Sequence, residues 1–184
     1  MSREGIMKKN LSVVPLVLLF CFTIACRDKA ASAELEKYRA QTAVEEQNKA
    51  LAMRFTDAYQ KGDVAAIKEI CSPDFVEHGV GRTFSLDQAI ETLKGNMAIF
   101  SDFTITAEDI IAKGDKVAVR YLLKVTHTGE GLGIPATGKK AESAGIEILR
   151  FKDGKIAEAW TTEDVLGLLT QLGFELKPKE EKKT

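Results

Sequence analysis

A two-residue alternation over residues 117–127 constrains the fold of this 184-residue chain more than any other feature. One face of this segment carries Val117, Val119, Tyr121, Leu123, Val125 and His127, and the other carries Arg120 and Lys124. Successive side chains of a strand point to opposite faces, so the pattern predicts a long strand with one buried and one solvated face.

Further strands are predicted around it. Apolar residues also alternate over residues 103–107, 146–151 and 156–162. The turn at residues 113–115 and the Asp153-Gly154 pair are hairpin signals, and Gly145 indicates a bulge. We therefore expect an antiparallel meander in the C-terminal half.

The segment before the strands has helical spacing. Leu51, Phe55 and Tyr59 form a buried stripe that Gly62 ends, and Asp63 can cap a short second helix. A capping box at Ser85 and Gln88 starts a third helix, which carries Leu86, Ile90, Leu93 and Met97. Helices followed by antiparallel strands predict an α+β domain.

The N-terminus has the pattern of an export signal. Basic residues precede the apolar run at residues 11–25, and small Ala25 stands directly before Cys26, as in a bacterial lipobox, although Thr23 replaces the preferred leucine. We expect a signal peptide at residues 1–25 and a lipid on Cys26, which would hold the exported protein on the periplasmic or extracellular face of the cell envelope. An uncleaved anchor or a plain signal cut nearby are the alternatives.

This pattern sets the expected domain organisation. Residues 26–45 are alanine-rich and polar, and we interpret them as a helical spacer. The folded domain is expected at residues 46–175, and the charged residues 176–184 are expected to be disordered.

Composition excludes several classes of partner. The net charge of -1 gives no basic field to attract nucleic acid. Two histidines without a ligand-pair spacing predict no metal site. Cys71 would have no disulfide partner once Cys26 is lipidated, and is expected to be a small buried hydrophobe.

The loop sequence GIPATGKK has the G-x-x-x-x-G-K spacing of a phosphate loop, through Gly133, Gly138 and Lys139. A phosphate loop needs Ser or Thr after the lysine and a helix behind it, but here Lys140 follows and the next residues alternate as a strand. We therefore expect neither a nucleotide nor any other cofactor.

The C-terminal half resembles the SnoaL-like polyketide cyclase, or ester cyclase, family of the nuclear transport factor 2-like superfamily. The resemblance is carried by AKGDKVAVR, HTGEGLGIPATGK, RFKDGKI and LGLLTQLG, and more loosely by Gly62-Asp63 and SPDFVEH. It covers residues 46–173 and implies a cone-shaped α+β barrel. In that fold three N-terminal helices pack on a strongly curved antiparallel sheet around an apolar pocket.

The resemblance implies that Asp164 is the acid/base group, because an aspartate at the end of the last strand has that role in the characterised cyclases. Glu158, Trp160, Thr162 and Asp164 share one strand face, which would place the carboxylate near Trp160 on the pocket wall. The alternative is that Asp164 only caps the helix that follows.

Two histidines are the other candidate catalytic residues. His127 ends the long strand, where it could polarise a substrate carbonyl or simply bind the glycine-rich loop. His78 stands where the family often has a pocket histidine, but the following GVGRTF departs from the family pattern.

Three residues are candidates for substrate binding. Tyr121 stands where the family often has tryptophan, and is either a hydrogen-bond donor or part of the wall. Trp160 is expected to line the pocket, and Glu147 is a further polar candidate whose direction the sequence leaves open. Ala159 replaces the histidine that is commoner in the family.

These features predict an exported SnoaL-like protein with an apolar pocket for a small carbonyl compound and acid/base proton transfer at carbon. The alternatives are a non-catalytic lipoprotein that binds a small ligand, and an interaction module that forms a homodimer through its open sheet face.

Overall fold

The computed structural model describes residues 13–79, 81–131, 133–175 and 177, with side chains from residue 29 onward. Three predictions lie outside this described part, because they concern residues or side chains that it does not include. They are the signal peptide, the lipid on the Cys26 side chain and nearly all of the charged tail. Two units are present, Met1–Ala43 and Val44–Thr184. Of the described helices, none is long and apolar enough to cross a membrane.

The first helix, α1 (Val13–Lys61), supplies all the described structure of the first unit and the first element of the second. In the first unit Leu35 and Tyr38 are exposed, whereas Phe55 is buried in the second. The helix ends where Gly62 adopts a φ of +64° and the Asp63 amide donates to the carbonyl of Ala58. The predicted end is confirmed.

Two shorter helices, α2 (Val64–Ile70) and α3 (Leu86–Ile99), begin at the predicted caps. The Asp63 carboxylate accepts from the Ala66 amide, and Ser85 and Gln88 form the reciprocal capping box. Between these helices lies a hairpin that the sequence analysis missed, β1 (Cys71–Gly79) and β2 (Arg82–Ser85).

The remaining strands are β3 (Phe100–Lys113), β4 (Lys116–His127), β5 (Lys140–Lys152) and β6 (Lys155–Glu163), and α4 (Val165–Leu172) follows them. The sheet order is β2-β1-β6-β5-β4-β3. Neighbours are antiparallel except β1 and β6, which are parallel. The predicted antiparallel meander is present as β3 to β6, and the sheet as a whole is mixed because the β1 hairpin joins its far edge through a parallel pair.

The predicted bulge at Gly145 was also wrong. Gly145 pairs in regular register with Tyr121 on β4 and with Glu163 on β6. A Cβ at this position would lie 2.4 Å from the Cζ and Oη atoms of Tyr121. The glycine is needed because the tyrosine ring occupies the space of a side chain, and the register shift in this hairpin falls between Arg150 and Phe151.

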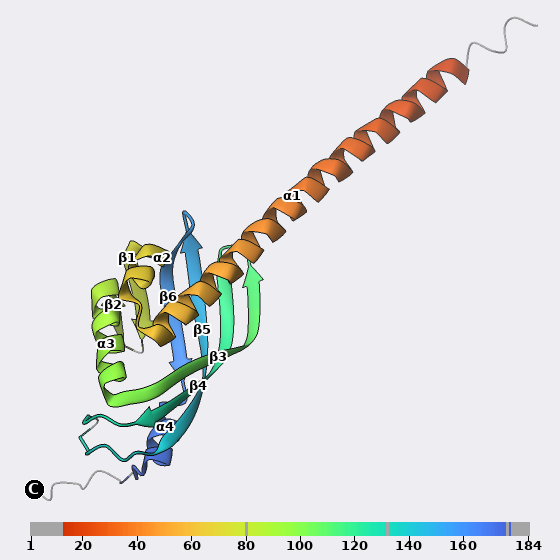
Figure 1. Ribbon diagram of the computed structural model, residues 1–184. Coiled ribbons are helices and arrows are strands. Elements are labelled where there is room, and N and C mark those ends of the chain that lie inside the picture. The colour runs from red at the N-terminus through yellow and green to blue at the C-terminus, as the bar shows by residue number, and fades with distance from the viewer. Residues whose placement is uncertain (1–12, 80, 132, 176, 178–184) are drawn as a thin grey trace, which may run out of the picture. The chain divides into compact units, whose positions relative to one another are not determined.

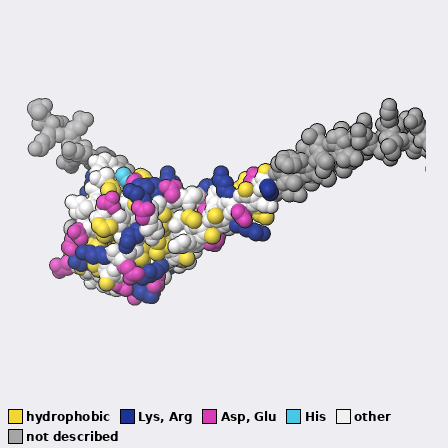
Figure 2. Space-filling view, turned by 90° about the horizontal axis from the view of Figure 1, so that it is seen from above, with side chains coloured by type: hydrophobic (Ala, Val, Ile, Leu, Met, Phe, Trp, Pro, Cys, Tyr) yellow, Lys and Arg dark blue, Asp and Glu magenta, His cyan; other side chains and the backbone are white. Residues whose placement is uncertain are grey.

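The second unit has the predicted α+β architecture, with a curved sheet and helices on its inner side (Figure 1). Buried side chains of β4, β5 and β6 pack there against the C-terminal part of α1 and against α2 and α3. A second cluster joins the other end of the sheet to α4. The α+β class is confirmed, and Figure 2 shows basic and acidic side chains interspersed over the viewed face.

The glycine-rich loop connects β4 to β5 and is fixed at both sides. The amides of Thr128 and Gly129 donate to the carbonyl of Ile99, and the Lys139 amine donates to the carbonyl of Leu172 at the end of α4. A strand follows the loop, so there is no helix N-terminus to receive a phosphate.

Candidate functional site

The inner face of the sheet and the helices enclose a cavity of about 380 Å³ in the second unit. Its wall is mostly apolar and includes the aromatic rings of Phe55, Phe75, Phe100 and Phe103. A cavity of this size and character suits a small apolar molecule held by a few polar groups.

Three glutamates project into this apolar space from three adjacent strands: Glu77 on β1, Glu163 on β6 and Glu147 on β5. Glu77 pairs with Ala159 and Glu147 pairs with Thr161, so the two carboxyl groups lie on either side of β6. The small side chains on β6 leave room between them.

Glu147 has the most perturbed carboxyl group of the cavity. It borders the cavity and so keeps some accessible surface, but the domain encloses it. Burial raises its pKa to about 8, the charge of Glu77 adds to the rise, and a hydrogen bond with Thr161 opposes it. Burial likewise raises the pKa of Glu77. A carboxyl group that titrates near neutral pH can both accept and return a proton.

Tyr121 and Glu163 form a second polar pair in the cavity. The Tyr121 ring lies over Gly145, and its hydroxyl donates to Oε2 of Glu163 at 3.5 Å. Burial and the charge of Glu163 raise the pKa of Tyr121, so the hydroxyl keeps its proton as a donor.

Tyr59 enters the cavity from α1 and is the other phenol on its wall. Its ring contacts Phe55 and Phe103 at centroid distances of 6.0 and 6.3 Å. Burial and then the charge of Glu77 raise the pKa of Tyr59. Its hydroxyl has no hydrogen-bond partner among the residues that the structure describes, so it can serve a ligand.

The structure brings two of the predicted site residues, Tyr121 and Glu147, into the cavity. The sequence analysis missed Glu77 and Glu163. A signal for Glu77 was present, because it follows the apolar Phe75 at the two-residue spacing of a strand.

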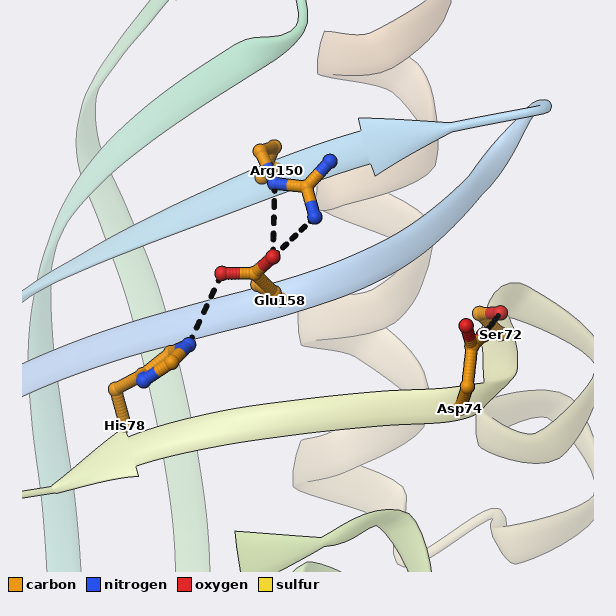
Figure 3. Close-up of polar contacts among 5 residues, drawn as sticks. All are labelled: Ser72, Asp74, His78, Arg150 and Glu158. Carbon is orange, nitrogen blue, oxygen red and sulfur yellow. Dashed lines mark hydrogen bonds and ion pairs between the residues drawn. The ribbon is translucent and has the colours of Figure 1, made fainter. Parts of the chain in front are cut away.

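The other predicted residues of β6 lie on the opposite face. Ala159, Thr161 and Glu163 line the cavity, so Glu158 and Trp160, at the alternate positions of the strand, point to the other face of the sheet. Figure 3 shows Glu158 on this outer face. The sequence established which residues share a face, but the expectation that Trp160 faces the pocket does not match the structure. The side chains of β6 that face inward are mostly small, and this leaves space for the cavity.

His78 belongs to a polar cluster on the outer face (Figure 3). Its Nε2 lies 3.0 Å from Oε2 of Glu158, whose other oxygen accepts from the Arg150 guanidinium. The His78 ring stacks on Trp160 with a centroid distance of 4.7 Å, because the two residues are paired on β1 and β6. Nearer the start of β1, Ser72 donates a hydrogen bond to Asp74.

Asp164 is exposed and is the N-cap of α4. Its Oδ1 accepts from the amide of Gly167 at 2.8 Å, and its side chain is not part of the cavity wall. This arrangement is the capping alternative that the sequence left open.

His127 is fully buried at the end of β4 but does not line the cavity. Its Nδ1 accepts from the Thr137 amide at 3.3 Å and lies 3.1 Å from the Thr137 hydroxyl. Its Nε2 has no partner among the described residues. In this position the ring holds the glycine-rich loop, which is the second of the two roles that the sequence allowed.

Comparison with known proteins then decides the family. The sequence model of the SnoaL-like polyketide cyclases matches residues 49–172. The chain belongs to the SnoaL-like polyketide cyclase family. A relative in this family, the aklanonic acid methyl ester cyclase AcmA of Streptomyces galilaeus, is 30% identical over 129 residues, which are 67% of this chain and 89% of the relative. A second aklanonic acid methyl ester cyclase, DnrD of Streptomyces peucetius, is 29% identical over 130 residues, which are 67% of this chain and 88% of the relative.

Solved structures share the fold. AclR of Streptomyces galilaeus, which is described as a hydroxylase, has a TM-score of 0.66 and 31% identity, with 70% of this chain and 97% of that chain covered. IdmH of Streptomyces antibioticus has a TM-score of 0.63 and 31% identity, with 67% and 96% covered. The SnoaL-like fold thus accounts for the second unit.

Proposed function

We propose that this SnoaL-like protein transfers a proton at carbon in a small apolar carbonyl compound bound in the cavity, as an ester cyclase does. The observation that carries the proposal is Glu147, a carboxyl group enclosed in an apolar cavity with its pKa raised to about 8. The names of the relatives, ester cyclases, support the same class of reaction.

Glu147 is the proposed acid/base group. A base that removes a proton from a carbon next to a carbonyl is most effective when its pKa is near the working pH. With its pKa raised to about 8, the Glu147 carboxylate is a stronger base than an ordinary glutamate. Glu163 is less suited to this role because it already accepts a hydrogen bond from Tyr121.

The proposed reaction is balanced within the cavity. The Glu147 carboxylate takes the proton of the substrate carbon, and the electron pair moves onto the carbonyl oxygen to give an enolate. The Tyr59 hydroxyl donates a hydrogen bond to that oxygen. The enolate carbon then attacks a second carbonyl carbon of the same molecule, and this new carbon–carbon bond closes the ring. The protonated Glu147 gives its proton to the alkoxide that forms.

Exchange of carbon-bound hydrogen in D₂O tests the first step without a known natural substrate. We would follow the α-protons of 1-indanone by NMR with the wild-type protein, and test aklanonic acid methyl ester for ring closure. Glu147→Gln is expected to lower the protein-dependent exchange by about 10²- to 10⁴-fold, the usual size of a general acid/base contribution.

Glu142→Gln is the matched control, because Glu142 lies on the same strand but is exposed and pairs with Lys124. This variant should exchange like the wild type. Equal exchange by wild type and Glu147→Gln would contradict the proposal.

A non-catalytic binding protein is the second candidate. It is favoured by Asp164, which the family resemblance makes the acid/base group but which here caps α4. Under this alternative the protein would bind 1-indanone without accelerating exchange, so the same experiment separates the two functions.

We also propose that the protein is exported and anchored through a lipid on Cys26, for which the support is the sequence of residues 1–26. Cys26→Ser should move the protein from the membrane fraction to the soluble fraction or leave its signal uncleaved. Cys21→Ser, in the same apolar run, should change neither property. Mass spectrometry of the mature N-terminus would read the lipid directly, and an unmodified Cys26 would contradict this proposal.

A further inference from the structure

Among the described residues, the cavity wall contains acidic groups but no basic ones. Its ionisable side chains are Tyr59, Glu77, Tyr121, Glu147 and Glu163, and no Lys, Arg or His is part of the described lining. These five groups come from α1, β1, β4, β5 and β6, so they face the space from several sides. No side chain of the described wall carries a positive charge that could form an ion pair with a negatively charged ligand.

The acidic groups also act on one another. Burial and then the charge of Glu77 raise the pKa of Glu147. Burial and then the charges of Glu77, Glu147 and Glu163 raise the pKa of Tyr59, and burial and then the charges of Glu163 and Glu147 raise the pKa of Tyr121. Each of these shifts disfavours a further negative charge. A carboxylate ligand would lose its hydration and meet the same repulsion, whereas a cation would be attracted by the glutamates in their ionised form.

We propose that the cavity selects apolar molecules that carry a protonated amine and excludes carboxylates of the same size and shape. This inference rests on the proposed function only in taking the cavity as the substrate site. Together the two describe a substrate with an apolar body, a carbonyl group and an ammonium group.

The wall favours an organic cation over a metal ion. Among the described residues there is no group of three or more His, Cys, Asp or Glu side chains that could hold a metal. Glu77 and Glu147 are separated by β6, and most of the lining is apolar. An ammonium group could pair with a carboxylate while its hydrocarbon part packs against the aromatic rings.

The proposal has a thermodynamic signature. An ammonium group beside Glu147 favours the carboxylate form, because opposite charges stabilise each other. Around pH 7 the ligand keeps its proton, and Glu147 releases its own proton to the buffer. The ionisable groups that share the described cavity wall with Glu147 are Tyr59, Glu77, Tyr121 and Glu163, and the Cys71 thiol also interacts with its charge. None of these groups supplies a positive charge that would already have this effect.

Isothermal titration calorimetry with three matched probes tests the selection. Naphthalen-1-ylmethylamine is the cation, naphthalen-1-ylmethanol the neutral analogue and naphthalene-1-carboxylate the anion. At pH 7 we expect the amine to bind at least about tenfold more tightly than the alcohol, which corresponds to one charge pair of about 1.4 kcal/mol. The carboxylate should bind more weakly than the alcohol.

Titrations in two buffers with different enthalpies of ionisation measure the number of protons released on binding. The wild-type protein should release close to one proton per amine bound and none with the alcohol. The double variant Glu77→Gln/Glu147→Gln should lose the preference for the amine and the proton release, while its affinity for the alcohol stays within about twofold. Glu142→Gln, exposed on β5, should behave as the wild type.

The inference is overturned if the alcohol or the carboxylate binds as tightly as the amine, if amine binding releases no proton, or if none of the three probes binds. Binding is measured without turnover, so the result is independent of the exchange assay. Selection of the amine without exchange of carbon-bound hydrogen would contradict only the proposed catalysis. Hydrogen exchange without selection of the amine would contradict only this inference.

Discussion

The ring of Tyr121 lies over Gly145 of the neighbouring strand, where a Cβ would come within 2.4 Å of it. The contact places the Tyr121 hydroxyl beside Glu163 in the cavity. One glycine therefore leaves the room that the Tyr121 ring needs to reach Glu163.

Gly145→Ala should push the Tyr121 ring from its site and lower the free energy of unfolding by about 1–3 kcal/mol, as overpacking does. Urea unfolding would measure this loss of free energy, and the loss should be smaller when Gly145→Ala is made together with Tyr121→Ala. Gly95→Ala is the control of opposite sign, because Gly95 is inside α3 with nothing within 4 Å of an added Cβ. Equal effects of the two substitutions would refute the packing argument.

The raised pKa of Glu147 predicts a pH dependence of stability. Its folded pKa of about 8 lies above the ordinary value of 4.5, so between these values the folded state binds more protons than the unfolded state. The stability from this group is complete below pH 4.5 and is lost as pH rises toward 8, with a slope of up to about 1.4 kcal/mol per pH unit.

Urea unfolding of the wild type from pH 5 to pH 9 would measure how steeply the free energy of unfolding falls with pH. Glu77, whose pKa is also raised, contributes in the same direction. Glu147→Gln should flatten the profile, and a variant profile as steep as that of the wild type would count against a buried carboxylic acid at this position.

The cap at Asp164 predicts a loss of stability without a loss of proton transfer. Asp164→Ala should cost about 1 kcal/mol, the usual value for an N-cap, because the Gly167 amide loses its acceptor. Asp63→Ala, at the N-cap of α2, should have a similar cost. If Asp164→Asn keeps the stability but abolishes hydrogen exchange, the acid/base role that the resemblance implied for Asp164 is correct.

The outer cluster predicts the opposite pH dependence. The hydrogen bond from Arg150, and then that from His78, hold the pKa of Glu158 below its ordinary value of 4.5. The stability from Glu158 is present above pH 4.5 and is lost as pH falls through the lower folded value. Glu158→Gln should reduce the loss of stability in acid but leave exchange in the cavity unchanged. A fall in exchange would mean that the two faces of the sheet are coupled.

Local signals in the sequence predicted much of the fold. The alternation in β4, the capping box at Ser85 and the turn at Asp153 depend on neighbouring residues, and all three are present. The hairpin turn has positive φ angles of 51° at Asp153 and 73° at Gly154. The parallel pairing of β1 with β6 joins residues about 80 positions apart, such as His78 and Trp160, and no local pattern indicates it.

The site was harder to predict than the fold. A strand pattern shows which side chains share a face, but tertiary packing decides which face is inside. Tyr121 was placed well because its strand has one clearly apolar face. On β6 the large Trp160 suggested the inner face, but the small Ala159 is inside because the cavity needs the space.

The pH dependence of hydrogen exchange tests the central claim, that Glu147 is the acid/base group of the cavity, most directly. The rate constant for exchange of 1-indanone should rise with pH and level off with a midpoint near 8, the pKa of Glu147. Glu147→Gln should remove this rise, and Glu142→Gln should keep it. A midpoint near 4.5, the ordinary value for a glutamate, or an unchanged profile in Glu147→Gln would contradict the claim.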